Sequence, residues 1–135
     1  MERTLNETQL DQKAQLIINA VDKRIEQYNV SHLYIGKVGD DEDFKDRYVD
    51  HINGDCYTFM WELAKGSHEQ IAQMEDFLIR YYKKHNKKII DNENEGSGGK
   101  DGGLLYVCLQ VGKELTIDDL QDDTSDISEG FPIRL

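Results

Sequence analysis

Helix-type and strand-type patterns alternate along this chain, and their order limits the fold to a small sheet packed with helices. Apolar residues recur at steps of three and four over residues 7–28, and Thr4 with Glu7 forms a capping box ahead of this stripe. Three short runs are rich in aromatic and branched residues, as is typical of strands: residues 31–38, 57–63 and 104–111. We therefore expect an α+β fold with a small three-stranded, mainly antiparallel sheet flanked by helices, one of them an added N-terminal helix.

Two more helices are expected between these strands. Residues 40–43 form an acidic cluster that suits a helix N-terminus, and Phe44, Tyr48 and Ile52 follow it at steps of four. Residues 66–67 are Gly-Ser, a pair that breaks a strand and caps a helix, and a one-sided apolar pattern continues from there to about residue 84. The expected order is therefore helix, strand, helix, strand, helix, strand.

The chain is expected to form one domain followed by a tail, since its 135 residues are a usual length for a single domain. Residues 1–112 contain every expected element, with a glycine-rich loop over residues 92–103 before the last strand. Residues 113–135 are acidic and poor in large apolar side chains, so we expect this C-terminal tail to be partly disordered.

Acidic residues outnumber basic ones by 27 to 16, and the formal net charge is −11. Seven acidic and two basic side chains give residues 111–135 a net charge of −5, which leaves −6 for the rest of the chain. This charge excludes a strongly basic nucleic-acid binder of the histone or ribosomal type. It favours a basic protein surface as a partner.

The sequence predicts a cytoplasmic protein with no membrane segment. No run approaches the roughly 18 apolar residues of a membrane span, and no signal sequence opens the chain. Its two cysteines are too few for a disulfide framework, which fits a reducing compartment.

Glu75 is the residue that composition does not explain. Its helical neighbours three and four positions away are all apolar: Ile71, Ala72, Leu78 and Ile79. A carboxylate buried among them needs a cation, a metal ion, hydrogen-bond donors or a proton. The alternative is that Glu75 lies at the edge of the apolar stripe and reaches water or an arginine.

Arg47 and His51 are four residues apart and share one face of the second helix. A guanidinium group can neutralise a phosphate and an imidazole can move a proton, so this pair suits a phosphate site. The alternative is an ordinary solvated face, in which Asp43, Asp46 and Asp50 act as salt-bridge partners.

Tyr34 and Gly36 fall on the same face of the first strand, where the glycine clears space beside the tyrosine. Four features in this order resemble the GIY-YIG nuclease family: the run Tyr34-Ile35-Gly36-Lys37, the arginine and histidine on a helix, the glutamate on a later helix, and a following asparagine. The resemblance covers residues 31–96. Either Asn92 or Asn94 matches the late asparagine of that family.

The resemblance implies hydrolysis of phosphodiester bonds in DNA or RNA with one Mg²⁺ or Mn²⁺ ion. In that family's scheme, Glu75 would hold the metal and Arg47 would neutralise charge in the transition state. Tyr34, alone or with a second tyrosine or with His51, would activate the attacking water. The remaining matched residues would contact the substrate: Gly36, Lys37, Asn92 and Asn94.

The family's first strand, which carries the G-I-Y motif, should lie about a dozen residues before Tyr34, where this chain has a helical pattern instead. Leu104-Leu105-Tyr106, preceded by Gly103, is the candidate to replace it. Paired with the strand that contains Tyr34, it would bring Tyr106 into the site.

Two functions therefore compete. The first is a divergent GIY-YIG-like endonuclease that depends on one metal ion. The alternative is a catalytically inactive acidic interaction protein on the same scaffold, such as an inhibitor or immunity-type partner of a basic protein. The matched motif residues favour the first and the net charge favours the second. A further option is that the acidic tail is autoinhibitory and occupies the site until it is displaced.

Overall fold

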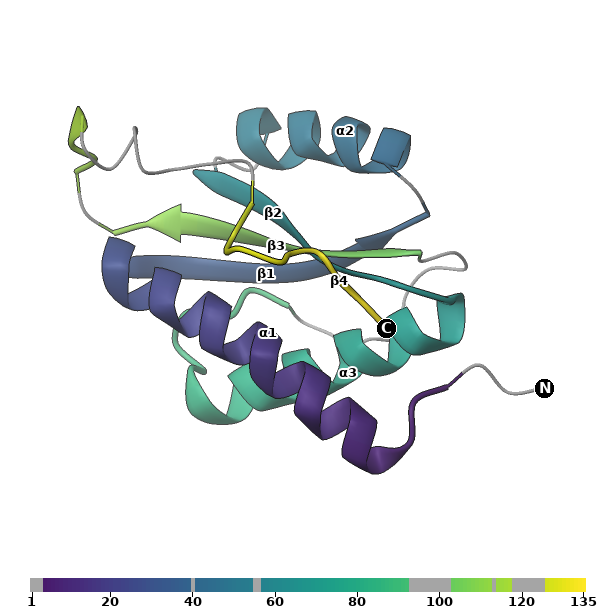
Figure 1. Cartoon of the computed structure of the whole chain (residues 1–135). Coiled ribbons are helices and arrows are strands. Elements are labelled where there is room, and N and C mark those ends of the chain that lie inside the picture. The colour runs from purple at the N-terminus through teal and green to yellow at the C-terminus, as the bar shows by residue number, and fades with distance from the viewer. Residues whose placement is uncertain (1–3, 40, 55–56, 93–102, 113, 118–125) are drawn as a thin grey trace.

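The computed structural model describes residues 4–39, 41–54, 57–92, 103–112, 114–117 and 126–135. They form a four-stranded sheet with helices on both faces (Figure 1). In chain order the elements are α1 (Glu7–Tyr28), β1 (Val30–Val38), α2 (Asp41–Val49), the π-helical turn η1 (Asp50–Gly54), β2 (Phe59–Lys65), α3 (His68–His85), β3 (Leu104–Val111) and β4 (Ile133–Arg134).

The strand order in the sheet is β1-β3-β2-β4, so β3 lies between β1 and β2, although it follows both in the sequence. β3 is antiparallel to both β1 and β2, and Tyr106 of β3 lies opposite Gly36 of β1. β4 is parallel to β2. The α+β class and the antiparallel pairing are confirmed, whereas the expected number of three strands is wrong because β4 adds a fourth, parallel strand.

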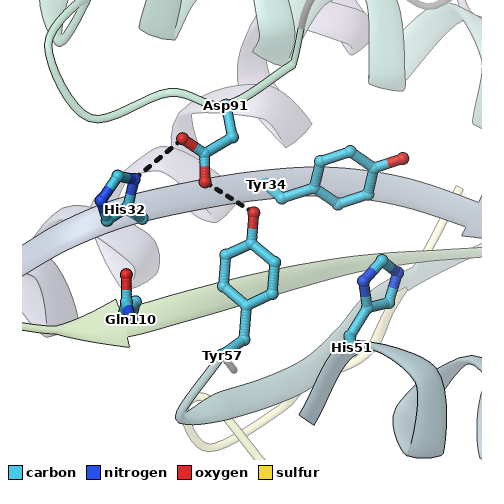
Figure 2. A pocket seen from close by; sticks show the side chains of 6 residues that line it. All are labelled: His32, Tyr34, His51, Tyr57, Asp91 and Gln110. Atoms are coloured by element: carbon cyan, nitrogen blue, oxygen red, sulfur yellow. Dashed lines mark hydrogen bonds and ion pairs between the residues drawn. The ribbon is translucent and has the colours of Figure 1, made fainter. Parts of the chain in front are cut away.

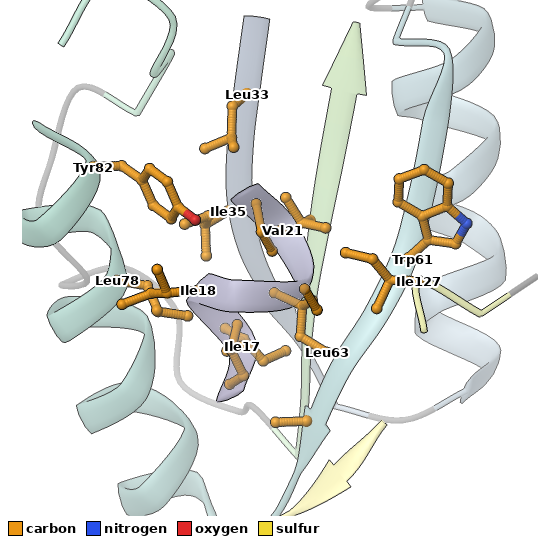
Figure 3. Packing of buried hydrophobic residues seen from close by; sticks show 14 of the residues in the cluster. Ile17, Ile18, Val21, Leu33, Ile35, Trp61, Leu63, Leu78, Tyr82 and Ile127 are labelled. Atoms are coloured by element: carbon orange, nitrogen blue, oxygen red, sulfur yellow. The ribbon is translucent and has the colours of Figure 1, made fainter. Parts of the chain in front are cut away.

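Helices α1 and α3 cover one face of the sheet, and α2 covers the other (Figure 1). The larger core lies between the sheet and helices α1 and α3, and it includes Ile17, Leu33, Trp61 and Leu78 (Figure 3). A smaller cluster on the α2 face contains buried Val38, Met60, Leu104, Tyr106 and Cys108. The two clusters follow from alternation along each strand, because successive side chains point to opposite faces.

The helices begin close to where the sequence places them. α1 matches the expected 7–28, but its capping box is made by Asn6 and Gln9 rather than by Thr4 and Glu7. Ser67 caps α3, and Gln70 completes its capping box. None of the described helices is long and apolar enough to cross a membrane.

The outer edge of β1 is covered by the segment that follows α3. The Leu33 N–H donates to the Ile89 carbonyl at 2.8 Å, and the Asp91 N–H donates to the Leu33 carbonyl at 2.7 Å. The Asn92 side-chain amide then pairs with both backbone groups of Ile35, at 2.9 and 2.8 Å. Hydrogen bonds of this kind occupy backbone groups that an edge strand would otherwise expose.

Residues 126–135 belong to the packed fold, which corrects the expectation of a separate tail over 113–135. Ile127 is 1% exposed and lies in the larger core (Figure 3). Arg24 donates from Nε to the Ile127 carbonyl at 2.9 Å and places its guanidinium over the Trp61 ring. At the end of the segment, the Leu135 N–H donates to the Lys65 carbonyl. Composition alone did not indicate this packing because acidic residues between 114 and 129 dominate the composition of the tail, although four of the last ten residues are large and apolar.

The packing of this segment predicts that Ile127→Ala lowers the free energy of unfolding by about 2–5 kcal/mol, as expected for deleting a buried branched side chain. Urea denaturation measures the difference. Ile117→Ala is the matched control, because Ile117 is 73% exposed and its loss should change stability by less than about 0.5 kcal/mol. Equal effects of the two substitutions would show that residue 127 is not part of the core.

Candidate functional site

The candidate site lies on the α2 face of the sheet, where β1, β3 and η1 meet. Tyr34 and Gly36 are two residues apart on β1, and β3 presents Tyr106 opposite Gly36. A Cβ atom added at Gly36 would collide with the hydroxyl and Cζ of Tyr106. Gly36 is therefore the residue that lets the tyrosine ring lie across β1, and the expected pairing of the last strand with the strand of Tyr34 is present.

His51 joins this pair from η1. Its Nε2 lies 2.9 Å from the Tyr106 hydroxyl, and the imidazole is buried. The Tyr34 ring lies beside it, with the two ring centroids 5.2 Å apart. Tyr34, His51 and Tyr106 therefore form one contiguous cluster, although they come from three separate segments of the chain.

Tyr106 keeps its proton at neutral pH. Burial is the main cause that raises its pKa far above the usual value, and the neighbouring Cys108 and Tyr34 raise it further. The positive charge of Arg47 lowers the pKa of Tyr106, and the negative charge of Glu75 raises it. These opposite effects put both charged groups within electrostatic range of the same hydroxyl.

Arg47 lies in the last turn of α2, and its side chain is exposed. It is thus positioned to act on a charged group that approaches the site from solvent. His51, four residues later in the π-helical turn η1, is buried, so the two residues expected on one helical face differ in exposure.

Glu75 is buried, as its apolar neighbours indicate, and its partner is a lysine. Its Oε1 lies 3.5 Å from Nζ of Lys37, and the two side chains are 8% and 10% exposed. Burial raises the pKa of Glu75, and the charge and hydrogen bond of Lys37 act against that rise. The alternative in which Glu75 reaches water or an arginine at the edge of the stripe is wrong.

Lys37 and Tyr34 project to opposite faces of β1. Lys37 follows the alternation of Leu33 and Ile35 toward α3, whereas Tyr34 faces α2. The lysine is therefore paired with Glu75 inside the fold, and its expected contact with substrate stays a prediction. The ion pair and the aromatic cluster therefore involve opposite faces of β1.

Asn92 and Asn94 are the two residues that could match the late asparagine of the motif, and only Asn92 lies in the described part of the chain. The Asn92 amide is occupied by the backbone of Ile35, so in this structure it anchors the segment after α3 instead of facing a substrate. Asn94 lies outside the described residues.

A metal ion fits here only if the substrate supplies most of its ligands. In the described part of the chain, no three His, Cys, Asp or Glu side chains come together to hold a metal. Glu75 offers a single carboxylate, and Mg²⁺ is often bound through one or two carboxylates together with substrate phosphates and water. The described residues therefore offer a metal ion one carboxylate, and that carboxylate is paired with Lys37.

An open hollow of about 510 Å³ adjoins the aromatic cluster (Figure 2). Besides Tyr34 and His51, it is lined by four residues that the motif comparison missed: His32, Tyr57, Asp91 and Gln110. The Tyr57 hydroxyl donates to Oδ2 of Asp91 at 2.6 Å, and His32 Nδ1 lies 2.9 Å from Oδ1 of the same carboxylate. No residue of the described part of the tail lines this hollow.

One sequence signal could have indicated part of this wall. His32 is two residues before Tyr34, so both side chains lie on the same face of β1. In the same way Gln110, four residues after Tyr106, lies on the same face of β3 as Tyr106. Asp91 had no such signal, because its place depends on the backbone pairing of its segment with β1.

The chain matches no family model, and no curated protein or solved structure matches it significantly. Its function is therefore inferred from the side chains of the site and from the motif resemblance.

The close approach of Tyr106 to Gly36 predicts that Gly36→Ala lowers the free energy of unfolding by about 1–3 kcal/mol, because the ring must move to admit a methyl group. Urea denaturation measures this loss. Gly54→Ala is the control, since a Cβ added there meets no other atom within 4 Å. A Gly36→Ala protein as stable as the wild type would contradict the close packing of the two strands.

The buried ion pair predicts a loss of stability in Lys37→Met that depends on pH. The substitution leaves the Glu75 carboxylate buried without a counter-charge, which should cost about 3–5 kcal/mol where that group is ionised. Because burial already raises the pKa of Glu75 above 4.5, the loss should be complete above the folded-state pKa. It should shrink as the pH falls through the raised folded-state pKa of Glu75, because the buried carboxyl of the variant then takes up a proton and loses its charge.

Denaturation of wild type and variant at about pH 8 and about pH 4 measures this difference. Lys37→Met/Glu75→Met should recover most of the stability, because it removes both buried charges. Lys23→Met, which alters an exposed lysine on α1, is the control. An equal loss at both pH values would contradict a charge-dependent role for Lys37.

Proposed function

We propose that this chain is a divergent GIY-YIG-like nuclease that hydrolyses phosphodiester bonds of nucleic acid with one divalent metal ion. The observation that carries the proposal is the contact of Tyr106 with His51 above Gly36. Tyr106 is thereby a second tyrosine close to Tyr34. It lies on β3, which follows the other motif residues in the sequence, whereas the family's G-I-Y strand precedes them.

In this proposal β3 takes the place of the family's G-I-Y strand. Gly103, Leu104, Leu105 and Tyr106 resemble that motif in order, and β3 pairs antiparallel with the strand that contains Tyr34. The chain would therefore hold the same strands next to each other in space while connecting them in a different order.

Activation of the attacking water is assigned to Tyr34 and His51, because both line the open hollow. The Tyr106 hydroxyl lies 2.9 Å from Nε2 of His51 and so holds the imidazole in the position from which it would take up a proton from water. Tyr106 remains protonated because burial raises its pKa, so it orients the imidazole and does not act as a base.

Arg47 is assigned the neutralisation of the negative charge that develops on the phosphate, because its exposed guanidinium can be reached by a substrate from solvent. By the motif resemblance Glu75 is the residue that would hold the metal ion, and a metal bound there would supply Lewis-acid stabilisation of the leaving oxygen. In this structure the carboxylate is buried on the α3 face in its ion pair with Lys37. In the hydrolysis, the base takes one proton from water and the water oxygen forms a bond to phosphorus. The bond to the leaving oxygen then breaks, and the protonated base returns its proton to that oxygen.

A catalytically inactive interaction protein is the second candidate, and one observation favours it. Lys37 already supplies a counter-charge to Glu75, so the carboxylate is compensated without any metal ion. On this alternative the acidic surface would bind a basic protein, and the aromatic cluster would serve only to hold the sheet together.

The first proposal predicts cleavage of DNA or RNA in the presence of Mg²⁺ or Mn²⁺, and a reduction of the rate by about 10²-fold or more in Glu75→Gln. Gel analysis of labelled single-stranded and double-stranded substrates measures the rate. Asp76→Asn is the matched control, because this neighbouring carboxylate on α3 is more exposed and pairs with Arg80.

EDTA should abolish cleavage by the wild type. Cleavage that persists in Glu75→Gln would contradict the assigned role of Glu75. A folded wild type that cleaves no nucleic acid with either metal would contradict the nuclease and favour the interaction protein.

A further inference from the structure

We propose that the hollow beside Tyr34 and His51 is a binding site for an unpaired nucleobase that carries an exocyclic amino group. The inference rests on the proposed function, since the base would arrive as part of a nucleic acid. It concerns four residues to which the motif resemblance assigns no role: His32, Tyr57, Asp91 and Gln110.

Tyr57 provides a fixed aromatic surface in the hollow. Its hydroxyl is bound by Asp91, and its backbone N–H donates to the His51 carbonyl at 3.1 Å. In Figure 2 its ring stands between His51 and Tyr34 on one side and His32 and Gln110 on the other. Bases stack on aromatic side chains that are held in place, and a ring already fixed loses little further freedom when it binds.

The charge of Asp91 distinguishes a base from a phosphate as the occupant. A carboxylate repels a phosphate, so the hollow does not suit the backbone of a nucleic acid. Each carboxylate oxygen has two lone-pair positions, and the bonds to Tyr57 and His32 account for one on each oxygen. An exocyclic amino group, as in cytosine, adenine or guanine, can donate to a remaining position.

Gln110 adds a group that both donates and accepts. Its amide lines the same hollow as the Asp91 carboxylate (Figure 2). The Watson–Crick edge of a base carries neighbouring donors and acceptors, which an amide and a carboxylate together can match. Thymine and uracil lack the amino group and would leave the carboxylate facing a carbonyl oxygen.

The position of the hollow specifies which nucleotide it would hold. Tyr34 and His51 belong both to the wall of the hollow and to the group assigned to water activation. The bound base would therefore belong to a nucleotide next to the cleaved phosphate. A base can reach this site only if it is unpaired, which means a single strand, a loop or a flipped nucleotide.

Fluorescence anisotropy of two labelled single-stranded DNA 12-mers, one all cytosine and one all thymine, tests this inference. The measurement is made in EDTA on the whole protein, so that binding is observed without cleavage. We expect the cytosine oligonucleotide to bind at least about fivefold more tightly. Asp91→Asn should remove this preference, because an amide can present either its oxygen or its amino group to the base.

Tyr57→Leu should weaken binding of both oligonucleotides by about tenfold, whereas Tyr57→Phe, which keeps the ring, should retain most of the affinity. Tyr48→Leu, at a 44% exposed position on α2, is the control and should change neither affinity. Gln110→Leu should weaken cytosine binding and leaves the Asp91 contacts intact, which keeps the test valid if Asp91→Asn does not fold.

Equal affinity for the two oligonucleotides, or no binding of either, would overturn the base site. So would a cytosine preference that survives in folded Asp91→Asn. Failure of the wild type to cleave with Mg²⁺ would overturn the proposed hydrolysis but would not alter these binding results, so the two proposals can fail separately.

Discussion

The antiparallel pairing of β1 with β3 is the constraint on which the rest of the structure depends. β3 occupies the centre of the sheet, so it supports β2 on its other side, and through β2 it supports β4. At Gly36 this pairing also brings the Tyr106 ring across β1, a position that any side chain larger than hydrogen would block. The geometry of the fold and the geometry of the aromatic cluster therefore have one origin.

β1 serves both faces of the sheet through the alternation of its side chains. Tyr34 and Gly36 face α2 and contribute to the aromatic cluster, while Lys37 faces α3 and holds Glu75. Because the two groups lie on either side of one strand, the charge of Glu75 still affects the pKa of Tyr106.

Local patterns predicted the features that local chemistry determines. The helix over residues 7–28 and the strand over 104–111 match the structure, and the apolar neighbours of Glu75 correctly indicated a buried carboxylate with a need for a partner. The sequence did not identify that partner, because Lys37 meets Glu75 only when its face of β1 packs against α3. Likewise, the parallel strand β4 and the place of Asp91 arise from backbone pairing between segments far apart in the chain, for which side-chain periodicity contains no signal.

The net charge of −11 has a specific consequence for a nuclease built on this site. Basic nucleic-acid binders gain affinity by releasing counterions from the phosphate backbone, and an acidic chain gains little from that source. Lys37 is already engaged by Glu75, which leaves Arg47 as the cation assigned to the phosphate. Stacking and hydrogen bonding to a base would then have to provide much of the binding energy. The Tyr57 ring, the Gln110 amide and the Asp91 carboxylate are the groups to which this binding is assigned.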